Sequence, residues 1–198
     1  MPLVAFEGLP GTGKTTVAIK LTSTLGKASY VKITKYIPKA ILTKFRGKER
    51  SPYEKLVFYI EWFKRLCRHL RKELNKSNGK LFIADRWYYT IVVYYSYHAS
   101  LTVDDFLKLV RYYEEDGDLL EPDLIFLFTI SYEEYVSRLK ARGNYKEYEI
   151  TYDFYRRCST YYEALGSLRQ VDVIDVTGRR VEDVTGDVIR RLSSLRGN

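Results

Sequence analysis

The chain contains 198 residues, of which 45% are hydrophobic and 29% are charged. This size is typical of one globular domain, and the composition excludes a fibrous or low-complexity chain. The apolar runs are too short to cross a bilayer, which argues against a membrane-spanning protein. The formal net charge of +8 favours anionic partners, and these include nucleotides as well as nucleic acids.

Composition and the start of the chain also indicate where the protein works. Met1 and Pro2 lead directly into the first predicted strand, so the sequence offers no cleavable signal segment. We therefore expect a soluble protein of the cytoplasm. One Met beside 19 Tyr and 33 Lys plus Arg resembles the composition of proteins from hot environments. The Cys and His residues have no metal-binding or redox spacing.

Strands and helices are predicted to alternate along the chain. In chain order we expect a strand at 3–7, a helix at 14–25, strands at 30–34 and 81–84 separated by a helix at 52–75, helices at 88–98 and 103–115, a strand at 124–128, helices at 131–142 and 151–165, a strand at 171–176 and a helix at 181–195. This alternation is typical of a parallel sheet covered by helices on both faces. Because no repeat or linker interrupts it, we expect one α/β domain over residues 1–198.

Local signals support the helices. Within 52–75 the apolar residues fall three or four apart, which indicates a single buried stripe, and Pro52 suits the first turn. Ser131 followed by Glu134 predicts a capping box for the helix that ends at Arg142.

The stretch after the first strand carries the clearest chemical signal. Gly8, Gly13, Lys14 and Thr15 match the P-loop pattern G-x-x-x-x-G-K-[ST] between a buried strand and a helix. Main-chain amides of such a loop converge on phosphate oxygens, the lysine supplies positive charge, and the hydroxyl is a ligand for Mg²⁺. We expect ATP·Mg²⁺ here, with phosphate contacts from Gly8, Gly11, Thr12, Gly13, Lys14, Thr15 and Thr16.

An acidic residue and a basic residue follow the third predicted strand. Asp85 stands at the carboxyl end of a buried strand, the edge where parallel sheets bind ligands, and Arg86 is next in sequence. We expect Asp85 to face the Mg²⁺ near Thr15, although a carboxylate there could also cap the following helix. Arg86 is expected to reach an anionic group beside the γ-phosphate.

A second group of cations stands at the end of the helix that follows Ser131. Arg138 and Arg142 are four residues apart and therefore share one helical face, just before a polar stretch. We expect a lid at about 138–150 that brings these two arginines to the transferring phosphate. The alternative is an exposed basic helix end, which the helix dipole favours on its own.

Taken together, these segments resemble the thymidylate kinase family of nucleoside monophosphate kinases over nearly the whole chain. The segments that carry the likeness are "FEGLPGTGKTT", "ADRWYYT", "EPDLIFLFTISYEEYVSRLKARG" and "VIDVTG". The resemblance implies a three-layer P-loop kinase fold with five strands. It also implies transfer of the γ-phosphate of ATP to a nucleoside monophosphate, and a homodimer. The catalytic residues it implies are Lys14, Asp85, Arg86, Arg138 and Arg142.

The acceptor half departs from the family pattern. Pro10 stands where the family usually has an acid, and Glu61 and Trp62 replace the pair that binds the acceptor phosphate. A replacement cation could come from Lys64 or Arg65. The candidates for acceptor contact are Phe58, Arg86 and Tyr95, the last in place of a glutamine.

Three alternatives remain at this level. A deoxynucleoside kinase needs a carboxylate base for its hydroxyl acceptor, and the segment Tyr30–Ala40 contains none. A polynucleotide kinase meets the same objection, so nucleic acid is not the expected partner. A nucleotide-dependent regulatory protein that has lost its acceptor site is also compatible with Pro10, Glu61 and Trp62. Our leading hypothesis is phosphorylation of a deoxynucleoside monophosphate, dTMP, to the diphosphate.

Overall fold

The computed structural model describes residues 3–46 and 48–196. Its elements in chain order, with 3₁₀ helices written η, are β1 (Leu3–Gly8), α1 (Lys14–Leu25), β2 (Ala28–Lys32), η1 (Ile33–Tyr36), α2 (Lys39–Arg46), α3 (Pro52–Lys76), β3 (Leu81–Asp85), α4 (Tyr88–His98), α5 (Val103–Glu115), β4 (Leu124–Thr129), α6 (Tyr132–Arg142), η2 (Glu147–Ile150), α7 (Tyr152–Ala164), η3 (Leu165–Ser167), β5 (Val171–Asp175) and α8 (Val181–Arg196).

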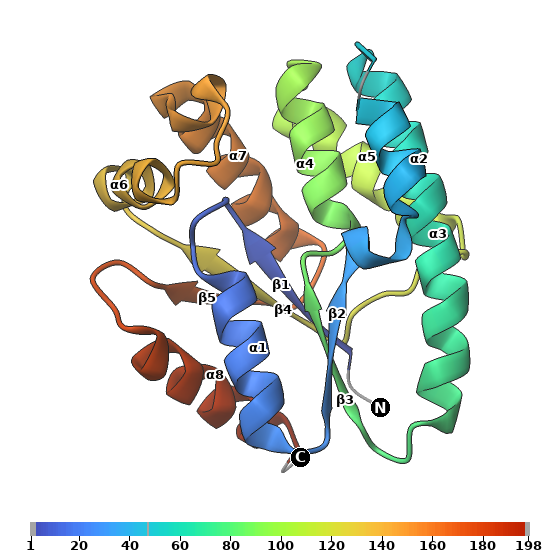
Figure 1. Ribbon diagram of the computed structural model, residues 1–198, viewed down its shortest axis with the longest axis vertical. Coiled ribbons are helices and arrows are strands. Elements are labelled where there is room, and N and C mark those ends of the chain that lie inside the picture. Colours follow the sequence, from blue (N-terminus) through green and yellow to red (C-terminus); the bar gives the residue numbers. More distant parts are fainter. Residues whose placement is uncertain (1–2, 47, 197–198) are drawn as a thin grey trace.

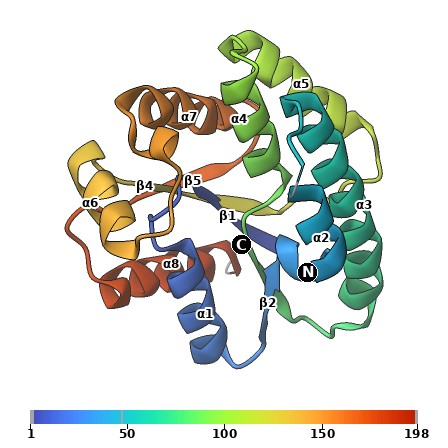
Figure 2. The same cartoon turned by 45° about the horizontal axis from the view of Figure 1, so that its top comes forward.

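The strands form one parallel sheet in the order β2-β3-β1-β4-β5. Helices α1 and α8 cover one face, and α3, α4, α5 and α7 cover the other (Figure 1, Figure 2). The predicted three-layer α/β fold with a five-stranded parallel sheet is therefore confirmed. Helix α6 lies beyond the carboxyl edge of the sheet beside α7, on the opposite side of that edge from α2 and α4 (Figure 1).

The middle of the sheet is the centre of the core. Every residue of β1 and β3 is buried, as expected for strands that have a neighbour on both sides and helices on both faces. Helix α3 buries a single stripe of apolar side chains, in agreement with its sequence period, namely Leu56, Ile60, Phe63, Leu66, Cys67 and Leu70.

The expected strand at 30–34 is wrong by two residues. The strand begins at Ala28, because pairing with β3 starts directly after the main-chain bond from Leu81 N–H to the Lys27 carbonyl. It ends at Lys32, which pairs with Asp85, where the partner strand also ends. The β-branched residues beyond this point enter η1 instead, since no further strand residue is available to pair with them.

Helix α2 is an element that the sequence did not predict. None of its residues is buried, and the helix is only eight residues long, a length at which an apolar pattern does not distinguish a helix from a strand. No helix within the described ranges is long and apolar enough to span a membrane.

The capping box predicted at the start of α6 is half right. Ser131 accepts a bond from the Glu134 amide, as expected for an N-cap. The Glu134 carboxylate does not return to Ser131, however. It accepts from the Gly178 amide at 2.6 Å and binds Arg138, because the loop after β5 lies within reach. The start of α6 and the loop after β5 are thereby held together.

The end of β1 generates a prediction about stability. A Cβ added to Gly8 would lie 2.3 Å from the Phe128 carbonyl oxygen, and the residue has a φ of +127°. We expect Gly8→Ala to lower the free energy of unfolding by at least about 2 kcal/mol, or roughly 4–8 °C in Tm for a chain of this size. Gly166→Ala is the matched control, because no heavy atom lies within 4 Å of its added Cβ. Equal Tm changes in the two variants would contradict the steric argument.

Candidate active site

The loop between β1 and α1 has the backbone of a phosphate cradle. Gly8, Gly11 and Gly13 all adopt positive φ values, which curl the chain and which other residues rarely adopt. Gly11 also lies against α6, since its added Cβ would be 3.2 Å from the Leu139 side chain. The loop opens onto the N-terminus of α1, where the helix dipole favours an anion.

Lys14 is folded back over this loop. Its Nζ donates to the Leu9 carbonyl at 2.5 Å and to Thr12 Oγ1 at 2.8 Å, and the residue is only 4% exposed. Burial holds the pKa of Lys14 well below its ordinary value, and the nearby positive charge of Arg86 adds to this effect. A polyphosphate at the loop would supply the negative charge that favours the ammonium form.

Asp85 lies directly opposite the start of α1. Thr15 Oγ1 donates to Asp85 Oδ2 at 2.6 Å, and the Tyr30 hydroxyl donates to the same oxygen at 2.8 Å. The Asp85 side chain therefore points at the P-loop hydroxyl rather than capping the following helix. Tyr30 comes from β2, next to β3 in the sheet, and sequence reasoning did not identify it.

Arg86 is held at the base of the site by its backbone and by two contacts of its guanidinium group. The residue has a φ of +74°, which is uncommon for a residue other than glycine and marks local strain. Its amide donates to the Phe6 carbonyl at 3.0 Å. Its Nη1 donates to the Gly8 carbonyl at 3.3 Å and to Thr90 Oγ1 at 3.2 Å. Arg86 thus contacts the P-loop and helix α4 together.

The two lid arginines have different surroundings. Arg142 lies close enough to Lys14 to lower the pKa of that lysine, after the larger effects of burial and Arg86. Arg138 binds the Glu134 carboxylate at 2.6 Å and donates to the Val176 carbonyl at 3.1 Å. Arg142 thus lies near Lys14, whereas the Arg138 guanidinium links α6 to the end of β5, although the Arg138 Cβ lies beside Gly11 of the P-loop.

The segment after α6 is attached to the site from two sides. The Tyr132 and Tyr135 hydroxyls donate to the main-chain carbonyls of Ile150 and Glu149. From across the cleft, the Tyr94 hydroxyl of α4 donates to Glu149 Oε1 at 3.2 Å. The segment thus bridges α6 and α4 in this structure.

On the acceptor side, Phe58 is covered by another ring of the chain. Phe45 of α2 stacks on Phe58 with 3.6 Å between ring centroids and 7° between planes. The guanidinium of Arg50 lies over Phe45, at 5.4 Å from its centroid. The Phe58 face that stacks on Phe45 is therefore filled by α2.

The other acceptor candidates separate in space. Lys64 binds Asp116 at 2.7 Å, so it is held toward the end of α5. Arg65 is exposed and lies over the Trp62 ring at 4.5 Å. Tyr95 lies near Tyr113 of α5, whose pKa burial raises to about 12 with smaller contributions from neighbouring tyrosines.

Neighbouring Tyr94, in contrast, lies beside Arg86. Burial raises the pKa of Tyr94, while the charge of Arg86 acts in the opposite direction. Tyr94 is thus the tyrosine of this pair next to the candidate phosphate site.

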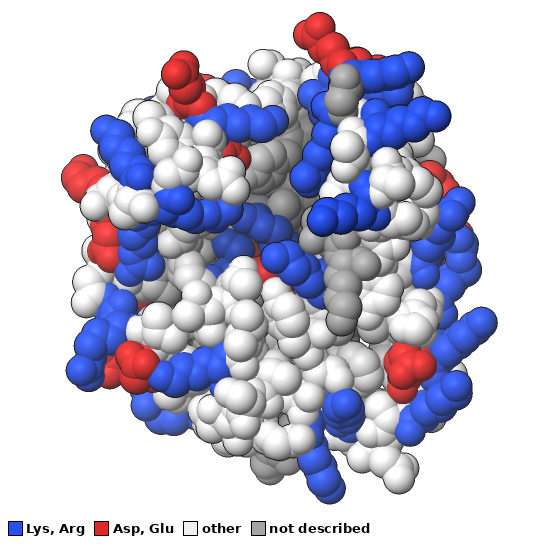
Figure 3. Space-filling view, in the orientation of Figure 1, with Lys and Arg blue, Asp and Glu red and all other residues white. Residues whose placement is uncertain are grey.

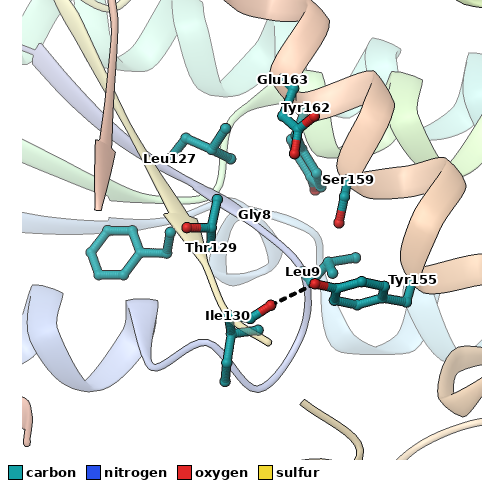
Figure 4. Close-up of a pocket in the computed structure, with 10 residues that line it drawn as sticks. Gly8, Leu9, Leu127, Thr129, Ile130, Tyr155, Ser159, Tyr162 and Glu163 are labelled. Carbon is teal, nitrogen blue, oxygen red and sulfur yellow. Dashed lines mark hydrogen bonds between the residues drawn. The ribbon is translucent and has the colours of Figure 1, made fainter. Parts of the chain in front are cut away.

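The space-filling view shows Lys and Arg side chains around a hollow in the upper half of the face (Figure 3). Behind the P-loop, a separate cavity of about 40 Å³ lies between the end of β4 and α7 (Figure 4). It is lined by Gly8, Leu9 and Tyr155 among others, and the Tyr155 hydroxyl donates to the Ile130 carbonyl beside it. Such a volume accepts about three water molecules and not a nucleotide, so the candidate nucleotide site is the open, basic edge of the sheet.

The sheet, the glycine-rich loop and the Thr15–Asp85 pair define a P-loop protein of the nucleotide-kinase class. The thymidylate kinase family model matches residues 6–188, and the chain therefore belongs to the thymidylate kinase family, a family of phosphotransferases. This membership confirms the expected ATP-dependent nucleoside monophosphate kinase, and a deoxynucleoside kinase is less favoured.

Individual relatives are distant but match over nearly their full length. A Methanocaldococcus jannaschii protein named "Probable thymidylate kinase" is 25% identical over 195 residues, which cover 97% of this chain and 96% of that protein. Thymidylate kinase from Ehrlichia chaffeensis aligns with a TM-score of 0.72 at 17% identity, covering 96% of this chain and 98% of that one. Deoxyadenosine kinase from M. mycoides aligns with a TM-score of 0.69 at 16% identity, covering 97% and 99%. These structural similarities support the fold alone, because kinases with different acceptors share it.

The different contacts of the lid arginines generate a prediction. Arg142→Ala should leave Tm within roughly 2 °C, because the side chain is exposed, and should lower turnover about 10-fold or more. Arg138→Ala should lower Tm by roughly 2–6 °C, because it removes bonds to Glu134 and Val176. Thermal unfolding and steady-state rates of both variants check this. A large loss of stability in Arg142→Ala alone would contradict the assignment.

Proposed function

We propose that this protein transfers the γ-phosphate of ATP to a deoxynucleoside monophosphate, with dTMP as the preferred acceptor. The observation that carries the proposal is the arrangement of Lys14, Thr15 and Asp85. The lysine lies within the loop, and the threonine hydroxyl is 2.6 Å from the carboxylate. Membership of the thymidylate kinase family supports the acceptor class.

The residues of the P-loop hold the donor phosphates. The amides of Gly11, Thr12, Gly13 and Thr16, with the turn at Gly8, surround the β- and γ-phosphates, and Lys14 neutralises their charge. Arg142 approaches from α6 and stabilises charge on the transferring group, while Arg86 contacts the acceptor phosphate. Arg138 supports this arrangement by holding α6 against the end of β5. Because phosphoryl transfer needs positioning and charge rather than a covalent group, these cations carry most of the catalytic effect.

Mg²⁺ fits the donor set beside the loop. Thr15 and Asp85 supply a hydroxyl and a carboxylate, which are oxygen ligands of the kind that Mg²⁺ prefers. The described residues contain no group of three or more His, Cys, Asp or Glu side chains that could hold a metal alone. Thr15 and Asp85 would hold the ion that accompanies ATP, and the ion would supply positive charge to the phosphate oxygens.

The residues of the proposed acceptor side support a monophosphate as the acceptor more strongly than they support a particular nucleobase. An incoming monophosphate is already an ionised nucleophile and needs no general base, whereas a nucleoside hydroxyl does. From the middle of β2, the residue that reaches Asp85 is the hydroxyl donor Tyr30 rather than an acid, and the segment Tyr30–Ala40 contains no acid. This favours a monophosphate acceptor over a nucleoside. Phe58, Tyr95 and Arg86 remain the proposed acceptor contacts.

Further proposals concern the domain, the location and the oligomeric state of the protein. Residues 1–198 act as one kinase domain with a lid at about 138–150, in the cytoplasm of an organism from a hot environment. The functional form is a homodimer, which is supported by the exposed side chains of Tyr53, Val57 and Tyr112 on α3 and α5. A solution mass near 23.3 kDa, measured by light scattering, would contradict the dimer.

A screen of acceptors tests the function. The purified protein with ATP and Mg²⁺ should release ADP with dTMP, and more slowly or not at all with other nucleoside monophosphates and with thymidine. Release with nucleosides alone would replace the proposal by a deoxynucleoside kinase. ATP binding without release for any acceptor would leave a regulatory nucleotide-binding protein.

Lys14→Ala tests the donor half in the same assay. It should lower turnover about 1,000-fold or more, because the loop then lacks its fixed positive charge. Lys20→Ala is the matched control from the same helix, since Lys20 pairs with Glu182 at the surface and such pairs contribute little. Near-normal turnover in Lys14→Ala would overturn the donor assignment.

The stacked rings on the acceptor side generate a further prediction. A base that stacks on the covered face of Phe58 must first displace Phe45, and an aromatic pair is worth about 0.5–1.5 kcal/mol. Phe45→Ala should therefore lower the acceptor KM about 2- to 10-fold and leave the ATP KM unchanged. Ile41→Ala, on the same helix and exposed, is the control. A higher acceptor KM in Phe45→Ala would mean that the Phe45 ring is part of the binding surface instead.

A further inference from the structure

Glu7 is a carboxyl group in the centre of the sheet that the proposed mechanism does not use. It lies on β1, the middle strand, and is 0% exposed. A buried acid normally needs compensating partners, because transferring an unpaired charge from water is costly. The partners of Glu7 therefore indicate what it does.

Two main-chain amides at the start of α4 bind its first oxygen. Trp87 N–H and Thr90 N–H donate to Glu7 Oε1 at 2.9 and 3.2 Å. Trp87 is the N-cap residue of α4, and its side chain makes no capping hydrogen bond. The Glu7 side chain, which comes from strand β1, thus caps the N-terminus of α4, where the helix dipole favours a negative charge.

The second oxygen of Glu7 leads to Arg86 through one hydroxyl group. Thr90 Oγ1 donates to Glu7 Oε2 at 2.5 Å. Since a hydroxyl has one hydrogen, the Thr90 oxygen then acts only as an acceptor toward its other neighbours. Arg86 Nη1 donates to it at 3.2 Å, and the Tyr162 hydroxyl lies 2.9 Å away. Glu7 therefore determines which way the Thr90 hydroxyl points and, through it, where Arg86 is held.

Charge reinforces this geometry. Arg86 and Lys14 attract the Glu7 carboxylate, and Asp85 is the other carboxylate that interacts with both of these cations. Tyr162 of α7 faces the group as a neutral donor. Burial raises the pKa of Glu7 to about 7, and the bonds from Thr90 and Trp87 and the charges of Arg86 and Lys14 oppose this effect. Glu7 thus changes its charge near neutral pH.

We propose that Glu7 is a positioning residue that fixes the Arg86 guanidinium toward the acceptor phosphate, acting through the hydroxyl of Thr90. The inference rests on the proposed function, in which Arg86 contacts the acceptor. Glu7 itself touches neither nucleotide. Its ionised form orients Thr90 as a donor to the carboxylate and leaves the Thr90 oxygen free to accept from Arg86.

A purely structural role as a helix cap makes a different prediction. Glutamine can accept from the amides of Trp87 and Thr90 in the same place, so Glu7→Gln keeps the cap. Its NH₂ group, however, donates toward Thr90 Oγ1 and competes there with Arg86. A cap alone would thus be preserved in Glu7→Gln, whereas a positioning residue would not.

Steady-state kinetics of three variants separate the two roles. Glu7→Gln and Thr90→Val should lower kcat/KM for dTMP about 10-fold or more, while the ATP KM stays within about 2-fold. Thr90→Ser keeps the hydroxyl and should restore most of the activity. Thr185→Val is the matched control, because Thr185 is buried on α8 and its hydroxyl donates to the Val181 carbonyl. Wild-type kinetics in Glu7→Gln would overturn the inference.

The pH dependence gives a second readout. Acceptor kcat/KM of the wild type should rise relative to that of Glu7→Gln as pH increases from 6 to 8, through the pKa of about 7. Titration of the acceptor phosphate affects both proteins equally and cancels in this ratio. A pH-independent ratio would contradict an active ionised form.

The stability of the wild type relative to Glu7→Gln should fall as pH rises, whereas its relative activity should rise. The folded-state pKa of Glu7 lies above its ordinary value of 4.5, so the folded protein binds more protons than the unfolded chain between these values. The wild type must then lose stability as pH rises from 4.5 to 7. Glu7→Gln lacks this loss, and its Tm should equal or exceed that of the wild type at pH 8. A lower Tm for Glu7→Gln than for the wild type at pH 8 would contradict the loss of wild-type stability that the raised pKa of Glu7 predicts.

A crystal structure of Glu7→Gln provides a test that does not depend on any kinase activity. The distances from Arg86 Nη1 to Thr90 Oγ1 and to the Gly8 carbonyl are 3.2 and 3.3 Å. We expect the first bond to be lost and the guanidinium to move. An unmoved Arg86 would overturn the inference even if the proposed function holds. An inactive wild type combined with a displaced Arg86 would overturn the function alone.

Discussion

The register between β1 and β3 controls the geometry of the whole site. Phe6 pairs with Asp85, and the Arg86 amide donates to the Phe6 carbonyl, so β3 ends level with the turn into the P-loop. A slip of one residue would turn Asp85 to the other face of the sheet. The bond of 2.6 Å between Thr15 and Asp85 is therefore a consequence of main-chain pairing in the most buried part of the fold. The pairing of the strands thus determines where the side chains of the site lie.

The buried cations of the site form hydrogen bonds to groups of the chain itself. Lys14 uses the Leu9 carbonyl and the Thr12 hydroxyl, and Arg86 uses the Gly8 carbonyl and Thr90. These hydrogen-bond partners are neutral, and the nearby carboxylates of Glu7 and Asp85 supply part of the opposing charge. A polyphosphate provides both hydrogen-bond acceptors and negative charge, which explains why the depressed pKa of Lys14 is compatible with phosphate binding. Lys14 and Arg86 are therefore in place before the substrate binds, and these groups need little reorganisation during the reaction.

The sequence could predict the parts of the site that depend on backbone geometry. A P-loop requires glycines at fixed spacing and a strand-to-helix context, and Asp85 follows from its place at the end of a buried strand. Tyr30 could not be predicted in the same way, because its contact with Asp85 depends on the register of β2 against β3. Helix α2 has only eight residues and buries none of them, and an apolar pattern this short does not distinguish a helix from a strand. Glu7 did leave a signal, since an acid within a continuous apolar run rarely stays buried without a partner.

The two halves of the site differ in how strongly the fold constrains them. The donor half consists of main-chain amides, glycine conformations and strand ends, and substitutions there disturb the sheet itself. The proposed acceptor half consists of Phe58 on α3 and Tyr95 on α4, together with Arg86 directly after β3. The Arg65 guanidinium lies 4.5 Å from the centroid of the Trp62 ring, and Phe45 covers Phe58. In the proposed site, base recognition can therefore change while phosphate transfer is kept, because Phe58 packs on Phe45 and Tyr95 lies near Tyr113, whereas Arg86 is held by the sheet through the Phe6 carbonyl.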